Sequence, residues 1–204
     1  MTKIKLCGIF RDCDAEYMNE AMPDYTGFVF AESKRRVSKK KALELRQKLN
    51  SNIKTVGVFV NEAIEEIADI YESGAINIVQ LHGDERADYI KALRKICNAP
   101  IIKAVRVKSS DDIKNTSQYA ADYILYDTFS SESFGGTGKS FNHELCIESS
   151  GDFFLAGGLN IENVIQKIKD VHPYAVDISS GIETNSVKDK DKILKIVKII
   201  REAS

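Results

Sequence analysis

Eight short apolar runs, each followed by a polar or amphipathic stretch, recur along the whole sequence. The runs are rich in β-branched and aromatic residues and are continuous rather than alternating, which is typical of strands covered on both faces. Regular alternation of such strands with helices predicts a parallel sheet. The expected strands are 4–7, 25–30, 55–60, 76–81, 101–107, 123–126, 153–156 and 174–178.

Eight strand–helix units favour a closed barrel, because an open doubly wound sheet usually has about five or six strands. An open sheet with one strand miscounted remains the alternative. The chain has 204 residues, whereas a (β/α)8 barrel typically needs about 250. We therefore expect one α/β domain over residues 1–204, a (β/α)8 TIM barrel with short loops. The expected helices are 12–22, 38–49, 62–73 (capped by Asn61), 84–96, 110–119, one from near Asn142, 161–169 and about 188–201.

The charge of the chain is almost balanced, with 29 Lys and Arg against 30 Asp and Glu. No strong basic field is present to attract nucleic acid or a membrane surface. No apolar run approaches the ~18 residues of a membrane span. The four cysteines are scattered without a paired spacing, which argues against a disulfide framework and favours a reducing cytoplasm. The sequence leaves a monomer or a homodimer open.

Two glycine-bearing turns follow the last two expected strands. The first contains Gly157 and Gly158, and the second contains Ser179, Ser180 and Gly181. Strands that end in this way expose main-chain N–H groups, which commonly bind phosphate, and barrels often carry such a site after their last two strands. The alternative is that each turn only reverses the chain.

Reactive side chains lie at the ends of several expected strands, where barrel enzymes place their chemistry. Each has a simpler explanation: a cysteine can fill space, an aspartate can cap a helix, a histidine can be structural, and an arginine can be solvated. Their occurrence at one rim is harder to explain in this way. The five residues are Cys7, Arg35, His82, Asp127 and Asp177.

Metal and nucleotide motifs are not found. Cys7, His82 and Asp177 lack local ligand spacing, so we predict no metal. Residues 135–140 contain Gly-Lys-Ser, but Ser133 occupies the position where a P-loop has its first glycine. No GxGxxG follows the first strand. The long stretch 128–140 predicts a lid over the site instead.

The chain resembles the phosphoribosylanthranilate isomerase family of tryptophan biosynthesis from end to end. The Gln-Leu-His-Gly and Asp-Ile-Ser-Ser-Gly segments at 80–83 and 177–181 are highly specific together. Phe10 and Tyr126 depart from the family's usual residues without removing a reactive group. The other matching segments are 5–8, 27–30, 33–38, 56–61, 127–128, 135–141, 155–160 and 175–183.

The resemblance implies an Amadori rearrangement of N-(5-phosphoribosyl)anthranilate that needs no cofactor. It implies Asp127 as general acid, Cys7 as general base, Arg35 as the contact of the anthranilate carboxylate, and Asp177 as a contact of the ribose hydroxyls. His82 faces the site without an assigned role. The phosphate is expected on the main-chain N–H groups of both glycine-bearing turns. A differently specific or non-catalytic phosphate-binding barrel is the alternative.

Overall fold

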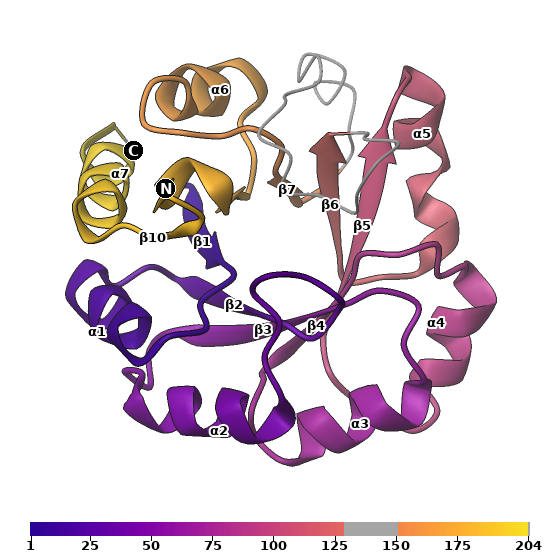
Figure 1. Cartoon of the computed structure of the whole chain (residues 1–204). Helices are drawn as coiled ribbons and strands as arrows, with labels where there is room; N and C mark the ends of the chain where they lie inside the picture. Colours follow the sequence, from indigo (N-terminus) through magenta and orange to yellow (C-terminus); the bar gives the residue numbers. More distant parts are fainter. Residues whose placement is uncertain (129–150, 204) are drawn as a thin grey trace.

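The computed structural model describes residues 1–128 and 151–203 and shows a closed barrel of eight parallel strands, each paired with the next and β8 paired with β1 (Figure 1). The barrel predicted from the alternation of apolar runs is therefore confirmed. The strands are β1 (Lys3–Cys7), β2 (Tyr25–Val29), β3 (Lys54–Phe59), β4 (Ile78–Leu81), β5 (Ile101–Val107), β6 (Tyr123–Thr128), β7 (Phe153–Leu155) and β8 (Ala175–Ile178).

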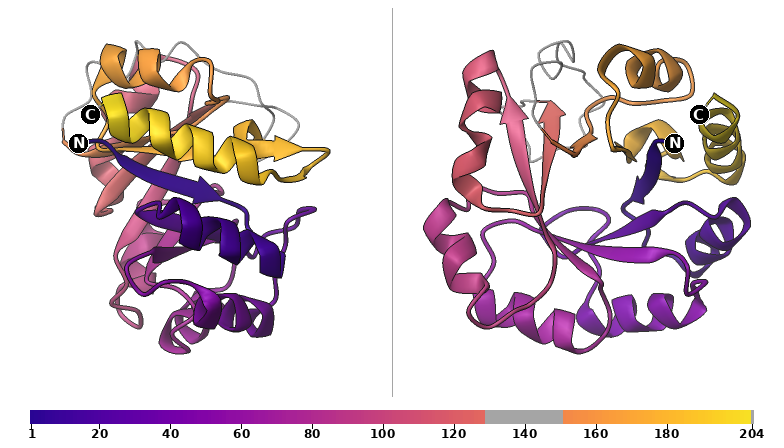
Figure 2. Two further views of the ribbon diagram at one scale, coloured as in Figure 1. Left: turned by 90° about the vertical axis from the view of Figure 1, so that its left-hand side faces the viewer. Right: turned by 180° about the vertical axis from the view of Figure 1, so that it is seen from behind.

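The helices form a ring outside the strands, and the two termini lie near each other at the β1 side of the ring (Figures 1 and 2). Arg201 near the C-terminus contacts Met1 and Asp24, which joins the two ends of the chain. The helices are α1 (Asp12–Ala21), α2 (Lys39–Lys48), α3 (Ile64–Glu72), α4 (Ala87–Leu93), α5 (Ser110–Lys114), the 3₁₀ helix η1 (Asn115–Tyr119), α6 (Val164–Val171) and α7 (Lys190–Ala203).

The interior of the barrel is apolar at the N-terminal ends of the strands and polar at their C-terminal ends. Tyr25, Leu125 and Phe154 belong to a small apolar cluster inside the strands. Successive residues of a strand point to opposite faces, so residues two positions further along the same strands also face inward. Asp127, two residues after Leu125, thereby lies at the mouth.

Two local features differ from what the sequence predicts. Asn61 does not cap α3: it has a left-handed φ of 50°, and the helix begins after Ala63 without a side-chain cap. An antiparallel hairpin of β9 (Glu183–Thr184) and β10 (Val187–Lys188) follows β8 and was not predicted. The helix expected from near Asn142 and the lid expected within 128–140 lie outside the described residues, except for Thr128.

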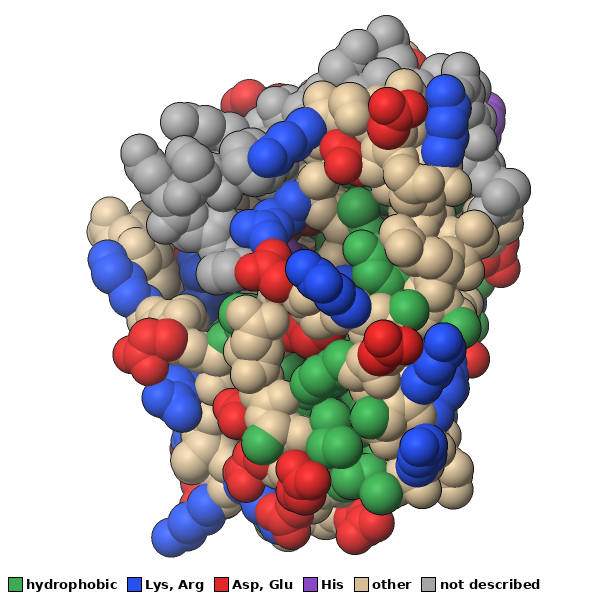
Figure 3. All heavy atoms as spheres, turned by 90° about the vertical axis from the view of Figure 1, so that its right-hand side faces the viewer, with side chains coloured by type: hydrophobic (Ala, Val, Ile, Leu, Met, Phe, Trp, Pro, Cys, Tyr) green, Lys and Arg blue, Asp and Glu red, His purple; other side chains and the backbone are tan. Residues whose placement is uncertain are grey.

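The face that carries α4 and α5 shows basic and acidic side chains interspersed around a strip of hydrophobic ones (Figure 3). Neither sign of charge dominates there, in keeping with the balanced composition. In the part of the chain that the structure describes, every helix is too short or too polar to cross a bilayer.

Candidate active site

The mouth of the barrel gathers the reactive residues that the sequence predicts. Cys7 ends β1, Asp127 lies near the end of β6, Asp177 lies on β8, and His82 directly follows β4. These four side chains are buried, whereas Arg35 is half-buried in the loop after β2. All five lie at the same end of the barrel because its strands are parallel.

The Cys7 thiol faces a space that only glycine leaves open on the neighbouring strand. Gly27 pairs with Cys7 in the β1–β2 register, and a Cβ atom there would lie 2.6 Å from the Cys7 Sγ. Lys5, two residues earlier on β1, is fully buried and donates to Asp177 Oδ2 over 2.7 Å. The other carboxylate oxygen of Asp177, Oδ1, is buried and has no hydrogen-bond partner among the described residues.

The protonation of Cys7 is set by opposing effects. Burial is the largest and raises the pKa of the thiol, and the Asp177 carboxylate adds to it. The ammonium groups of Lys5 and Lys188 act in the opposite direction and lower the pKa of the thiol, Lys5 more strongly than Lys188. Burial disfavours the Lys5 ammonium, yet Asp177 and Cys7 outweigh it and raise the pKa of Lys5. Lys5 is therefore a fixed cation beside the thiol.

A second charged network joins the loop after β2 to the hairpin after β8. The Arg35 guanidinium donates from Nε and Nη2 to the two carboxylate oxygens of Glu183, over 2.7 and 2.6 Å. Lys188 Nζ is 2.6 Å from Glu183 Oε1 and 2.9 Å from the Ser179 carbonyl oxygen. Burial opposes the charge of Glu183, but Arg35 and Lys188 hold its pKa below the usual value. The ion pair with Glu183 thus holds the positively charged Arg35 side chain at the mouth of the barrel.

Asp127 contacts a histidine that is itself held by an amide. His82 Nε2 lies 3.0 Å from Asp127 Oδ2, and His82 Nδ1 lies 2.8 Å from the Gln80 side-chain nitrogen. The turn after His82 is supported by a buried ion pair, since Lys103 Nζ contacts Glu85 Oε2 over 2.8 Å and the Gly83 carbonyl oxygen over 2.7 Å. The main chain therefore places His82 against Asp127.

The two glycine-bearing turns lie side by side. Gly157 and Gly158 both have left-handed φ angles, 92° and 66°. In the short 3₁₀ helix η3 (Ser180–Ile182), a Cβ atom on Gly181 would lie 2.0 Å from the Leu159 carbonyl oxygen, so the second turn packs directly against the first. The described hydrogen bonds give no protein acceptor for the main-chain N–H groups of Gly157, Gly158, Ser180 or Gly181. Such groups suit an anion.

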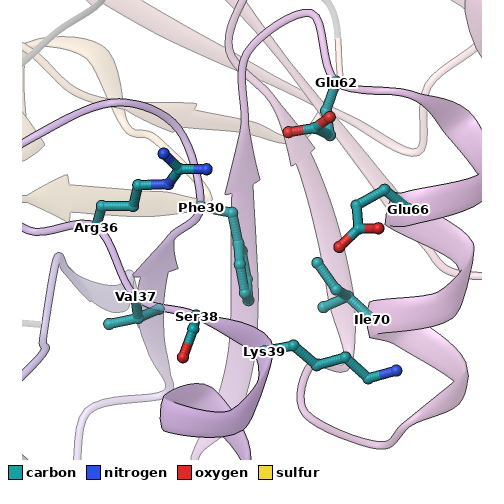
Figure 4. A pocket seen from close by; sticks show the side chains of 8 residues that line it. All are labelled: Phe30, Arg36, Val37, Ser38, Lys39, Glu62, Glu66 and Ile70. Carbon is teal, nitrogen blue, oxygen red and sulfur yellow. The ribbon is translucent and has the colours of Figure 1, made fainter.

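A separate pocket of about 420 Å³ lies in the helix ring, between the start of α2 and α3 (Figure 4). Arg36 lines it, together with Phe30, Lys39 and Glu66. It contains none of the five predicted rim residues. The two adjacent arginines therefore point to different surroundings: Arg35 to the mouth and Arg36 to this outer pocket. Within the described residues, no group of three or more His, Cys, Asp or Glu side chains is arranged to hold a metal.

Sequence reasoning assigned no role to Lys5, Gln80, Glu183 or Lys188. The signal for the first two was available, because each lies two residues before a predicted site residue on the same strand and must share its face. A lysine or glutamine in an otherwise apolar, buried strand is itself unusual. Glu183 and Lys188 gave no such signal, since their placement depends on the unpredicted hairpin.

A closed barrel with a thiol and a carboxyl group at its mouth has the architecture of a (β/α)8-barrel enzyme. Comparison with known proteins shows to which family of barrel enzymes the chain belongs. Residues 4–199 match the family model of N-(5'-phosphoribosyl)anthranilate isomerase, and the chain belongs to this family. The enzyme of that name from Endomicrobium trichonymphae is 47 % identical over 201 residues, which cover 98 % of this chain and 99 % of the relative.

Solved structures of the same family have the same fold as this chain. The phosphoribosyl anthranilate isomerase of Thermotoga maritima superposes with a TM-score of 0.89 at 36 % identity, covering 99 % of this chain and all of that chain. A phosphoribosyl anthranilate isomerase in complex with reduced 1-(o-carboxyphenylamino)-1-deoxyribulose 5-phosphate gives a TM-score of 0.86 at 35 % identity, with 99 % and 100 % coverage.

Proposed function

We propose that the mouth of this barrel catalyses the Amadori rearrangement of N-(5'-phosphoribosyl)anthranilate to 1-(2-carboxyphenylamino)-1-deoxyribulose 5-phosphate in tryptophan biosynthesis. The observation that carries the proposal is membership of the isomerase family over nearly the whole chain, with the thiol and carboxyl groups both buried at the mouth. One solved relative holds a reduced form of this product.

The reaction begins with proton transfer from Asp127. Protonated Asp127 gives its proton to the furanose ring oxygen, and the C1–O bond breaks, with its electron pair going to that oxygen. The anthranilate nitrogen supplies the electron pair that forms the C1=N bond of a Schiff base. The carboxylate that remains on Asp127 accepts a hydrogen bond from its neighbour His82, which lies 3.0 Å away.

The second step is proton removal by Cys7. Its thiolate takes the proton from C2, the C–H electron pair forms the C1=C2 bond, and the C=N electron pair returns to nitrogen as an enolamine. Tautomerisation then gives the ketone at C2. Lys5 stabilises the thiolate, since the positive charge of its ammonium group lowers the pKa of Cys7. C2 is oxidised to a ketone while C1 is reduced within the same molecule, so the reaction has no net redox change and requires no external oxidant, reductant or cofactor.

The substrate is a small phosphorylated molecule, and three features of the mouth fit its parts. The two adjacent glycine-bearing turns suit the phosphate, and Asp177 Oδ1, which has no partner among the described residues, suits a ribose hydroxyl. Arg35 suits the anthranilate carboxylate, because its Nη1 has no acceptor in the described part of the chain.

We expect a monomer or homodimer in the cytoplasm, without nucleic-acid or membrane partners.

The test is turnover of N-(5'-phosphoribosyl)anthranilate by the wild type, Cys7→Ser and Asp127→Asn. We expect turnover by the wild type and a loss of about 10²–10⁴-fold in each variant, the usual contribution of a general acid or base. Cys97→Ser, at a buried cysteine beyond α4, is the matched control and should retain activity. A wild type that binds the substrate without converting it would favour a non-catalytic barrel.

A further inference from the structure

Gln80 is a buried polar residue that the proposed reaction leaves without a role. It lies inside the barrel on β4, two residues before His82, and is 1 % exposed. Its amide nitrogen lies 2.8 Å from His82 Nδ1, and the opposite ring nitrogen of His82 lies 3.0 Å from Asp127 Oδ2. The three side chains form a continuous chain of hydrogen bonds that ends at the acid.

The chemistry of the amide determines where His82 carries its proton. An amide nitrogen only donates hydrogen bonds, so His82 Nδ1 must accept and cannot carry a proton. A neutral imidazole then has its proton on Nε2, which faces Asp127. His82 is therefore a donor to the Asp127 carboxylate.

We propose that Gln80 is a positioning residue that fixes His82 in its neutral Nε2–H form, so that His82 stabilises the carboxylate formed when Asp127 gives up its proton. This role rests on the proposed function, because it concerns the acid of that reaction. The proton passes from Asp127 to the ring oxygen, the electron pair stays on the carboxylate, and His82 keeps its own proton throughout.

The opposite tautomer would work against the acid. With a proton on Nδ1, the lone pair of His82 Nε2 would face Asp127 and accept its proton, directing that proton away from the substrate. An acceptor at position 80 would favour this state. With the amide nitrogen toward the ring, the Gln80 side-chain oxygen, Oε1, is buried without a partner among the described residues. A flipped amide would place this oxygen against Nδ1 and favour a proton there, so the tautomer of His82 tests the orientation of Gln80 directly.

The main chain at His82 is held by contacts that do not involve Gln80. The His82 main-chain nitrogen donates to the Phe59 carbonyl oxygen over 2.8 Å, and the Gly83 nitrogen donates to Glu85 Oε2 over 2.9 Å. A substitution at Gln80 is therefore expected to change the proton on His82 while leaving the ring near Asp127.

The test is ¹⁵N NMR of histidine-labelled protein at neutral pH, with His82 assigned among the three histidines by its loss in His82→Asn. We expect a protonated Nε2 and an unprotonated Nδ1 in the wild type, a loss of this preference in Gln80→Met, and a proton on Nδ1 in Gln80→Glu. Protonated Nδ1 in the wild type, or an unchanged tautomer in Gln80→Met, would overturn the proposal.

Kinetics provide the second readout. We expect kcat to fall at least ~10-fold in Gln80→Met, part of the contribution of a general acid, with KM little changed. Gln166→Met, at an exposed glutamine on α6, is the matched control and should leave both tautomer and kcat unchanged. A wild type without turnover would refute the proposed function, while the tautomer would still be read from the spectrum.

Discussion

At the end of β1, the thiol of Cys7 shares its surroundings with the ammonium groups of Lys5 and Lys188 and the carboxylate of Asp177. Arg35 contributes a further positive charge from the loop after β2. Burial raises the pKa of the thiol, so the base form depends on these cations. We therefore expect kcat/KM to rise with pH above neutrality as the thiol ionises.

Replacing Lys5 should make the thiolate harder to form. In Lys5→Met, the pKa of Cys7 is expected to rise by about one unit or more, because an adjacent opposite charge typically shifts a pKa by about 1–3 units. The pH dependence of Cys7 alkylation by iodoacetamide measures this, with Cys7→Ser as the blank.

Two further variants support that measurement. Lys103→Met, at a buried lysine paired with Glu85, should leave the alkylation profile unchanged. Lys5→Met leaves the buried Asp177 carboxylate unpaired, which commonly costs about 3–5 kcal/mol, so the double variant with Asp177→Asn repeats the test in a protein without that charge. If the pH dependence of Cys7 alkylation is the same as in the wild type in both Lys5 variants, Lys5 does not affect the pKa of the thiol.

The adjacent arginines should differ in kinetics. Arg35→Ala is expected to raise KM by roughly 10–100-fold and to change kcat less, because hydrogen bonds to a charged group contribute about 1.5–3 kcal/mol and the carboxylate is remote from the moving protons. Arg36→Ala should be mild, since Arg36 pairs with an exposed Glu32 in the structure. Steady-state kinetics check both variants, and the reverse order would assign the contact to Arg36.

At the scale of elements, a short turn after a strand can bind an anion only if its backbone comes close to the ligand. Gly158 has a left-handed φ of 66° and adjoins the turn that contains Gly181. A β-branched side chain at this φ is strained and would also cover the exposed N–H groups. The proposed phosphate site therefore depends on both turns together, and neither turn contains a Lys or Arg residue.

Gly158→Val should weaken the binding of inorganic phosphate, measured by its inhibition constant, by roughly tenfold or more, as expected for the loss of about 1.4 kcal/mol of hydrogen bonding. The matched control is Gly74→Val after α3, where φ is 79° and no atom lies within 4 Å of an added Cβ. The control should show similar strain in thermal unfolding and normal phosphate inhibition. Equal inhibition in both variants would place the phosphate elsewhere.

At the scale of the whole molecule, three pairs of strands are joined at their N-terminal ends by the same kind of hydrogen bond. In each of these pairs, a side chain just before β2, β4 or β6 accepts the main-chain N–H at the start of the preceding strand. Asp24 accepts from Ile4 over 2.9 Å, Asn77 from Thr55 over 2.9 Å, and Asp122 from Ile101 over 2.7 Å. Asp24 also binds Arg201 of α7 over 2.7 Å, so it fastens the last helix to the first strands.

Asp24→Asn should lower the free energy of unfolding at pH 7 by about 1–3 kcal/mol, the contribution of hydrogen bonds to a charged group. Burial opposes ionisation of Asp24, but Ile4 N–H, Lys3 and Arg201 outweigh it and hold its pKa below the usual value. Stability from a depressed carboxyl pKa is present above the unfolded value of about 3.9 and is lost as pH falls through the folded value.

Urea unfolding of the wild type and Asp24→Asn at pH 7 and at about pH 2.5 measures this difference. We expect it to shrink at the lower pH, and a difference that is the same at both pH values would contradict the electrostatic explanation. Asp122, which binds Arg94 in a similar way, provides a second site for the same comparison.

The sequence by itself determined the barrel, because eight buried strands separated by amphipathic helices have few other ways to cover both faces of a parallel sheet. It also placed Cys7, His82, Asp127 and Asp177 at one rim, since the C-terminal ends of parallel strands meet there. Strand limits agreed to within about two residues, whereas the limits of α4 were three residues shorter at each end.

Only the tertiary structure decided which of these groups touch. The bond between His82 and Asp127 spans β4 and β6, and the Arg35–Glu183 pair joins a loop after β2 to a hairpin after β8. Neither the strand pattern nor local propensity encodes such distances, because they depend on barrel closure and on side-chain conformations across the mouth. The sequence thus specified the residues at the rim, and the closed barrel placed the Asp127 carboxyl group beside His82 and the Cys7 thiol near the ammonium group of Lys5.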